Sequence, residues 1–155
     1  MLGVGPEGPF TVDLAKDGPH ALIAGTTGAG KSELLQTLIC ALAARNRPDQ
    51  LTFVLIDYKG GAAFKDCARL PHTVGMVSDL DGHLTQRALT SLAAEIRRRE
   101  RLLLDADAKD IDDYQGTLPR LVLVIDEFAA LVAELPDFVA GLVDIARRGR
   151  SSAST

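Results

Sequence analysis

Residues 25–32 constrain the fold more than any other part of this sequence. They read GTTGAGKS and fit the pattern G-x-x-x-x-G-K-[ST] at every fixed position. An apolar run at residues 20–24 precedes them, and a helical pattern begins at about residue 31. The loop therefore stands between a predicted strand and a helix N-terminus, whose free N–H groups and dipole favour an anion. We predict a nucleoside triphosphate site here.

Each kind of residue in the loop has an expected role. The glycines let the backbone approach phosphates closely, Lys31 reaches the β- and γ-phosphates, and Ser32 binds Mg²⁺. The residues predicted to bind nucleotide are Gly25, Thr26, Thr27, Gly28, Ala29, Gly30, Lys31 and Ser32. The alternative is a glycine-rich turn that only begins a helix, but a chance match is rare, on the order of one in a few hundred.

Composition limits the remaining possibilities. A chain of 155 residues suits one domain over residues 1–155, with residues 1–18 as a leading loop segment that holds an edge strand at 10–14. No apolar run approaches about 18 residues, so we expect no transmembrane helix, and the N-terminus lacks the features of a signal peptide. We expect Cys40 and Cys67 to be buried thiols. A net charge of −4 neither indicates nor excludes nucleic-acid binding.

Apolar runs alternate with helical patterns along the chain. The expected strands are 20–24, 51–57, 74–78 and 121–127, and the expected helices are about 31–45, 83–105 and 136–148. This alternation predicts an α/β fold with a mainly parallel sheet flanked by helices.

The run at 121–127 ends in two acids that complete the predicted site. Acids at the carboxyl end of a parallel strand lie beside a ligand bound at that edge. We expect Asp126 to hold Mg²⁺ together with Ser32. Glu127 should point in a different direction along the extended chain and polarise the attacking water. The alternative is an acidic pair that merely ends a strand. A second acid directly after the metal-binding one is more typical of ATPases than of GTPases. The sequence also has no Asn/Thr-Lys-x-Asp motif that would recognise guanine.

Three further patterns have two interpretations each. Residues 57–61, DYKGG, are either a sharp turn or a functional loop at the ligand-bearing edge. The basic run at 97–101 is best explained as a solvated helix face, with a binding patch as the alternative. Residues 147–150, RRGR, are either a helix C-terminal cap or a source of an arginine that reaches a neighbouring subunit's site in a ring.

Taken together, these motifs resemble the FtsK/SpoIIIE family of ring motors over about residues 3–150. The resemblance rests on the loop, DYKGG at 57–61, LPH at 70–72, VIDEF at 124–128 and IARRGR at 145–150. Within the family, the chain looks most like the EccC/EssC ATPases of type VII secretion, because it has the motifs DYKGGA, LPH and DLDGH. DNA pumps usually have Asp-Pro-Lys where this sequence has Asp-Tyr-Lys.

The resemblance implies a RecA-like P-loop fold that uses ATP with Mg²⁺ and works as a homo-oligomeric, hexameric ring. The secretion ATPases lie on the cytoplasmic side of a membrane-anchored machine and engage exported proteins, while the DNA pumps thread duplex DNA. By position, Lys31, Ser32, Asp126 and Glu127 match the family's phosphate, metal and catalytic residues. Arg150 matches the trans-acting arginine within one residue, so Arg147 and Arg148 stay candidates.

The end of the chain departs from the family pattern. In the family, the arginine segment leads into another core strand, but here it leads into residues 151–155, SSAST. We therefore expect a sheet truncated before its last core strand or strands, which would leave backbone groups unpaired. A module that binds ATP without turnover is accordingly one alternative to a secretion motor, and a DNA-translocating motor is another.

Overall fold

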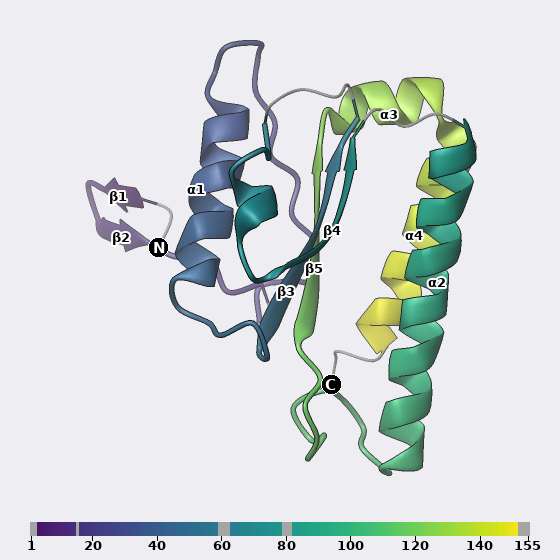
Figure 1. Cartoon of the computed structure of the whole chain (residues 1–155). Coiled ribbons are helices and arrows are strands. Elements are labelled where there is room, and N and C mark those ends of the chain that lie inside the picture. The colour runs from purple at the N-terminus through teal and green to yellow at the C-terminus, as the bar shows by residue number, and fades with distance from the viewer. Residues whose placement is uncertain (1–2, 15, 59–62, 79–81, 152–155) are drawn as a thin grey trace.

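The fold is a parallel sheet with helices on both faces. The computed structural model describes residues 3–14, 16–58, 63–78 and 82–151. Its main sheet has the order β4-β3-β5, in which β3 (Leu51–Asp57) pairs in parallel with β4 (Thr73–Ser78) and β5 (Arg120–Asp126). Figure 1 shows α1 (Lys31–Ala43) on one face of the sheet and α2 (Gly82–Asp105) with α4 (Pro136–Ser151) on the other. The predicted α/β fold with a parallel sheet is confirmed.

The central strand β3 separates two apolar cores. Phe53 and Leu55 are fully buried against Ile39 of α1. Ile56 faces the other way and packs with residues of α2 and α4, including Leu92. Side chains alternate along a strand, and a parallel strand covered on both faces is apolar almost throughout. This is why the bounds of β3 match the predicted range of 51–57.

The predicted strand at residues 20–24 is wrong. Residues 20–26 form neither strand nor helix, and Leu22 has 77% of its surface exposed. An apolar run becomes a strand only if a neighbour accepts and donates its ladder hydrogen bonds. Among the described residues, β5 has a strand partner only on its β3 side.

The N-terminal segment also differs from the expectation. Its strands are β1 (Gly3–Gly5) and β2 (Gly8–Phe10), which pair antiparallel as a hairpin in place of an edge strand at 10–14. A short 3-10 helix, η1 (Cys67–Arg69), lies between β3 and β4. Cys67 is buried as expected, but Cys40 is exposed on α1, so that half of the cysteine prediction is wrong.

Two differences concern the helices after β5. A short helix that the sequence patterns did not predict, α3 (Phe128–Glu134), follows β5 directly. The final helix α4 runs to Ser151, three residues past the expected end at 148. None of the described helices is long and apolar enough to cross a membrane.

Candidate functional site

The phosphate loop leads into α1 at the end of the sheet where the parallel strands finish (Figure 1). Gly28 and Gly30 have φ values of 77° and 81°, a left-handed backbone that only glycine adopts readily. The first helical hydrogen bond runs from the Leu34 N–H to the Gly30 carbonyl at 2.9 Å. The N–H groups of the first turn before it have no helical acceptor, so they are available to an anion.

Lys31 lies across its own loop. Its Nζ donates to the carbonyl oxygens of Gly25 and Thr26, each at 2.9 Å. These contacts hold the ammonium group over the loop. A positive charge at this place can neutralise phosphate oxygens that the loop N–H groups bind.

Ser32 and Asp126 meet although 94 residues separate them in sequence. The Ser32 hydroxyl donates to Asp126 Oδ2 at 2.8 Å, and Asp126 Oδ1 accepts the Glu127 N–H at 2.9 Å. The bond joins the first turn of α1 to the last residue of β5. Asp126 is 8% exposed, so this contact is largely shielded from water.

The donor chemistry of this pair fits Mg²⁺. A hydroxyl and one carboxylate are the hard oxygen ligands that Mg²⁺ takes from a protein, together with substrate phosphates and several waters. Within the described ranges, no group of three or more His, Cys, Asp or Glu side chains could hold a metal ion by itself.

Glu127 is not extended, and the expectation that it continues the strand is wrong. Its backbone is left-handed, with φ 58° and ψ 34°, and it is the N-cap of α3. The Glu127 carbonyl accepts the N–H groups of Ala130 and Leu131 at 3.0 and 3.1 Å. The sharp turn from β5 into α3 imposes this conformation, which costs a non-glycine residue about 1–3 kcal/mol and is common at functional sites. The Glu127 side chain is exposed.

Asp57 is a buried carboxylate beside Asp126. The two residues are paired in the β3–β5 register and both end their strands. Asp57 is 2% exposed, and its Oδ2 has no hydrogen-bond partner among the described residues. The sequence left the role of residues 57–61 open; the structure places Asp57 next to the predicted metal ligand, while residues 59–62 lie outside the described residues.

Tyr58 points to the opposite face of the sheet. Its hydroxyl donates to Glu134 Oε2 at 2.8 Å, and this hydrogen bond raises the pKa of Tyr58 above its ordinary value. The contact ties the end of β3 to the end of α3. No sequence pattern singled out Glu134, because α3 itself was not predicted.

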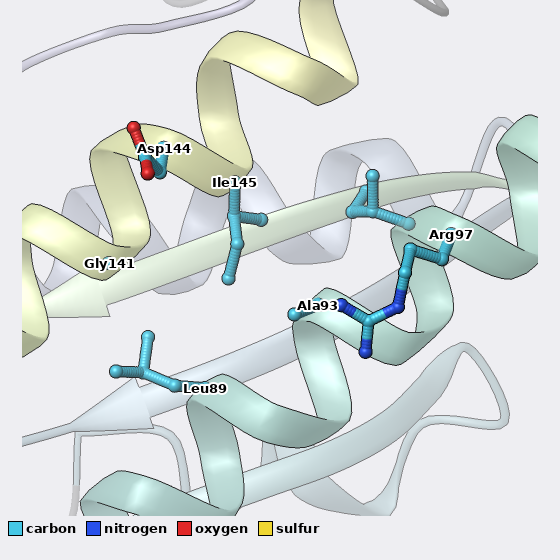
Figure 2. Close-up of a pocket in the computed structure, with 7 residues that line it drawn as sticks. Leu89, Ala93, Arg97, Gly141, Asp144 and Ile145 are labelled. Atoms are coloured by element: carbon cyan, nitrogen blue, oxygen red, sulfur yellow. The ribbon is translucent and has the colours of Figure 1, made fainter.

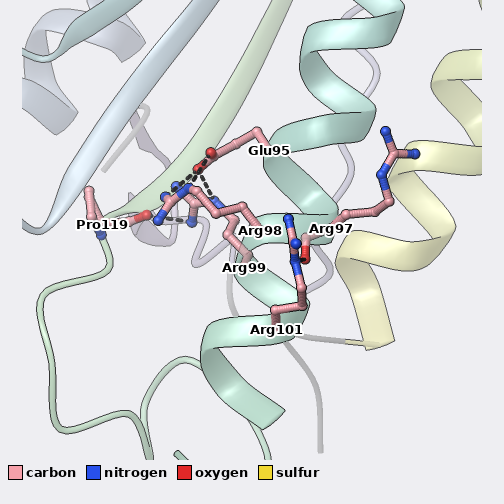
Figure 3. Close-up of polar contacts among 6 residues, drawn as sticks. All are labelled: Glu95, Arg97, Arg98, Arg99, Arg101 and Pro119. Carbon is pink, nitrogen blue, oxygen red and sulfur yellow. Dashed lines mark hydrogen bonds and ion pairs between the residues drawn. The ribbon is translucent and has the colours of Figure 1, made fainter. Parts of the chain in front are cut away.

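Half of the basic run on α2 is structural (Figure 3). Arg99 is buried; its Nε donates to Glu95 Oε1 at 2.8 Å and its Nη1 to the Pro119 carbonyl at 2.6 Å. Arg98 donates to the same carboxylate at 2.7 and 2.8 Å, and this bond is the main cause of a lowered Glu95 pKa. Arg97, Arg98 and Arg101 keep the exposed character expected of the run, whereas Arg99 does not.

A separate pocket lies between α2 and α4 (Figure 2). Its volume is about 200 Å³ and its lining includes Leu89, Arg97 and Asp144. Because α2 and α4 cover the sheet face opposite α1, this pocket is distinct from the nucleotide loop.

The arginines at 147–150 lie in the last turns of α4, which ends at Ser151. Arg147 is exposed. The side chains of Arg148 and Arg150 lie outside the described residues, so the role expected for Arg150 stays a prediction.

Known proteins match this chain over nearly its full length. The model of the FtsK/SpoIIIE family matches residues 2–154. The type VII secretion system protein EssC of Staphylococcus aureus is 47% identical over 146 residues, covering 86% of this chain and 10% of the relative. The ESX secretion system protein EccC of Geobacillus thermodenitrificans is 45% identical over 145 residues, with the same two coverages.

A solved structure agrees with these sequence matches. The cytoplasmic domain of the type VII secretion ATPase EccC from Thermomonospora curvata superposes with a TM-score of 0.88 at 37% identity. The match covers 97% of this chain and 20% of that one. The chain thus has the P-loop ATPase fold of EccC domains, and it spans about 10% of the length of the curated relatives that it matches.

Proposed function

The chain belongs to the FtsK/SpoIIIE family, and we propose that it is a motor ATPase domain that hydrolyses ATP with Mg²⁺ to drive protein export in a type VII secretion-like machine. The observation that carries this proposal is the hydrogen bond from Ser32 to Asp126 at 2.8 Å. It brings the end of the phosphate loop to the end of β5, where the proposed reaction needs a hydroxyl and a carboxylate together.

Each residue of the site has its own role in the proposed chemistry. The loop N–H groups and Lys31 bind the phosphates, and Ser32 and Asp126 hold Mg²⁺, which supplies a Lewis acid to the phosphate oxygens. Glu127 orients the attacking water and accepts its proton. Its exposed side chain at the end of β5 and its left-handed backbone support this role, since such a backbone is common at functional sites.

A ring assembly would complete the site from a neighbouring copy. In this proposal an arginine from residues 147–150, with Arg150 as the first candidate, reaches the phosphates bound by the next subunit. Such an arginine stabilises charge that develops in the transition state. The exposed position of Arg147 on α4 is compatible with a contact between subunits.

We propose an exported protein as the substrate and a place on the cytoplasmic side of a membrane-anchored complex. The similarity to EssC and to the cytoplasmic domain of EccC supports both statements. Duplex DNA is the alternative substrate. The engagement of Arg98 and Arg99 by Glu95 weighs against DNA, because non-specific DNA binding needs free cations.

The test measures nucleotide binding and turnover separately. Lys31→Ala should weaken binding of fluorescent ATP severely, whereas Glu127→Gln should bind normally and lose hydrolysis. Unchanged affinity in Lys31→Ala would refute the phosphate site, and turnover by Glu127→Gln at the wild-type rate would refute the assigned base. Tight binding by the wild-type chain with no turnover at any protein concentration would identify a binding-only module. Salt-dependent stimulation by duplex DNA would identify a DNA motor.

A further inference from the structure

We propose that Asp57 is a further positioning residue of the nucleotide site, whose free Oδ2 orients Mg²⁺ by accepting a hydrogen bond from a water bound to the metal. The inference rests on the proposed function, because it assumes that Ser32 and Asp126 hold the cation. It adds a carboxylate that the phosphate-loop pattern and the acidic pair after β5 do not include.

The position of Asp57 follows from strand alternation. Phe53 and Leu55, four and two residues earlier on β3, pack with Ile39 of α1, so Asp57 points to the same face. Asp126 also points there, since it bonds to Ser32 in the first turn of α1. The two acids are direct partners in the parallel register, and neighbouring strands lie about 4.8 Å apart. One bound water can therefore span from Asp57 to a cation held by Asp126.

The unpaired oxygen is the second observation. Buried polar atoms nearly always have partners, and an exception calls for an explanation such as an ion or water. Among the described residues, the only other buried side-chain atom without a partner is His72 Nδ1. That atom is the bare nitrogen of a ring whose Nε2 donates to the Asn46 carbonyl at 2.8 Å, so it needs no ligand. Among the described residues, no comparable contact explains why Asp57 Oδ2 is unpaired.

An indirect contact fits the chemistry better than direct ligation. Ser32 and Asp126 already touch each other and are placed to bind the cation themselves. Mg²⁺ gives up its waters reluctantly and keeps several of them in nucleotide sites. Groups that hold such waters or ligands tune metal affinity, and their loss typically lowers it about 10–100-fold.

The decisive variant is Asp57→Asn, which keeps the shape and removes the charge beside Asp126. Binding of Mn²⁺ to the chain saturated with ATPγS, followed by electron paramagnetic resonance, should weaken about tenfold. Binding of ATPγS in EDTA should stay within about twofold of wild type. Without ligand, the melting temperature should rise by about 2–4 °C, because an unpaired buried acid no longer lies next to a second one.

Tyr58→Phe is the matched control. It removes a hydrogen bond from the adjacent residue on the opposite face of the sheet, so it should leave Mn²⁺ affinity unchanged. A general loosening of the end of β3 would instead weaken metal binding in both variants.

Three results would overturn the proposal. They are unchanged Mn²⁺ affinity in Asp57→Asn, a loss of ATPγS binding in EDTA as large as the loss of Mn²⁺ binding, and a lowered melting temperature. If Asp57→Asn does not fold, Asp57→Ser in the same metal titration gives a second measurement, and unchanged Mn²⁺ affinity there also refutes the idea. Absence of ATPγS binding by the wild-type chain, in EDTA and with Mg²⁺, would instead refute the proposed function.

Discussion

Replacement of Ser32 by alanine tests the contact on which the site is built. The Ser32 hydroxyl donates to Asp126 Oδ2 at 2.8 Å, and Asp126 is 8% exposed. A hydrogen bond to a charged group contributes about 1.5–3 kcal/mol, and its removal leaves a buried oxygen without a partner. We therefore expect Ser32→Ala to lower the free energy of unfolding by about 1.5–3 kcal/mol, measured by urea denaturation without nucleotide.

A double-mutant cycle isolates the pair. The change in unfolding free energy should appear as a shift of the urea midpoint at constant m-value. Because the two side chains are in direct contact, Ser32→Ala combined with Asp126→Asn should show a coupling energy of about 1 kcal/mol or more. The control is Ser91→Ala at an exposed position of α2, which should change stability by less than about 0.5 kcal/mol. A coupling energy near zero would refute the claim that this bond joins α1 to β5.

Three other predictions test the remaining contacts of the fold and site. Arg99→Ala should lower the free energy of unfolding by about 2–3 kcal/mol in urea denaturation, because it removes hydrogen bonds to Glu95 and Pro119 from a buried site. The control Arg101→Ala should lower it by less than about 0.5 kcal/mol. Equal effects of the two substitutions would refute the structural role of Arg99. The folded-state pKa of Glu95 lies below its ordinary value of 4.5, so its contribution is present above that value and is lost as the pH falls through the lowered pKa. The free energy of unfolding, measured as a function of pH, should accordingly fall less steeply at acidic pH in Glu95→Gln than in the wild-type chain. A pH profile identical to that of the wild type would contradict the ion pair. Glu127→Gly should raise the melting temperature, since glycine relieves the left-handed strain at φ 58°, and should abolish any ATP hydrolysis; a lower melting temperature would argue against strain at this residue.

The sequence predicted most reliably those features that local pattern alone controls. The phosphate loop was recognisable because its glycines, Lys31 and Ser32 act within one short segment that leads into a helix. The bounds of β3 matched because burial on both faces makes a parallel strand apolar almost throughout. The apolar pattern was misleading where strand formation depends on a neighbouring strand. Residues 20–24 are apolar, but the described sheet places no strand beside them.

The tertiary structure decided how these parts combine. It joined Ser32 to Asp126 across 94 residues, turned the Glu127 backbone left-handed at the start of α3 and buried Asp57 without a partner. It also converted Arg99 from an expected surface charge into a link between α2 and the segment before β5. The sequence by itself determined the chemistry available to the chain, because residue type and spacing carry that information. Only the folded chain determined which carboxylates share the edge of the sheet, because strand order and register bring distant residues together.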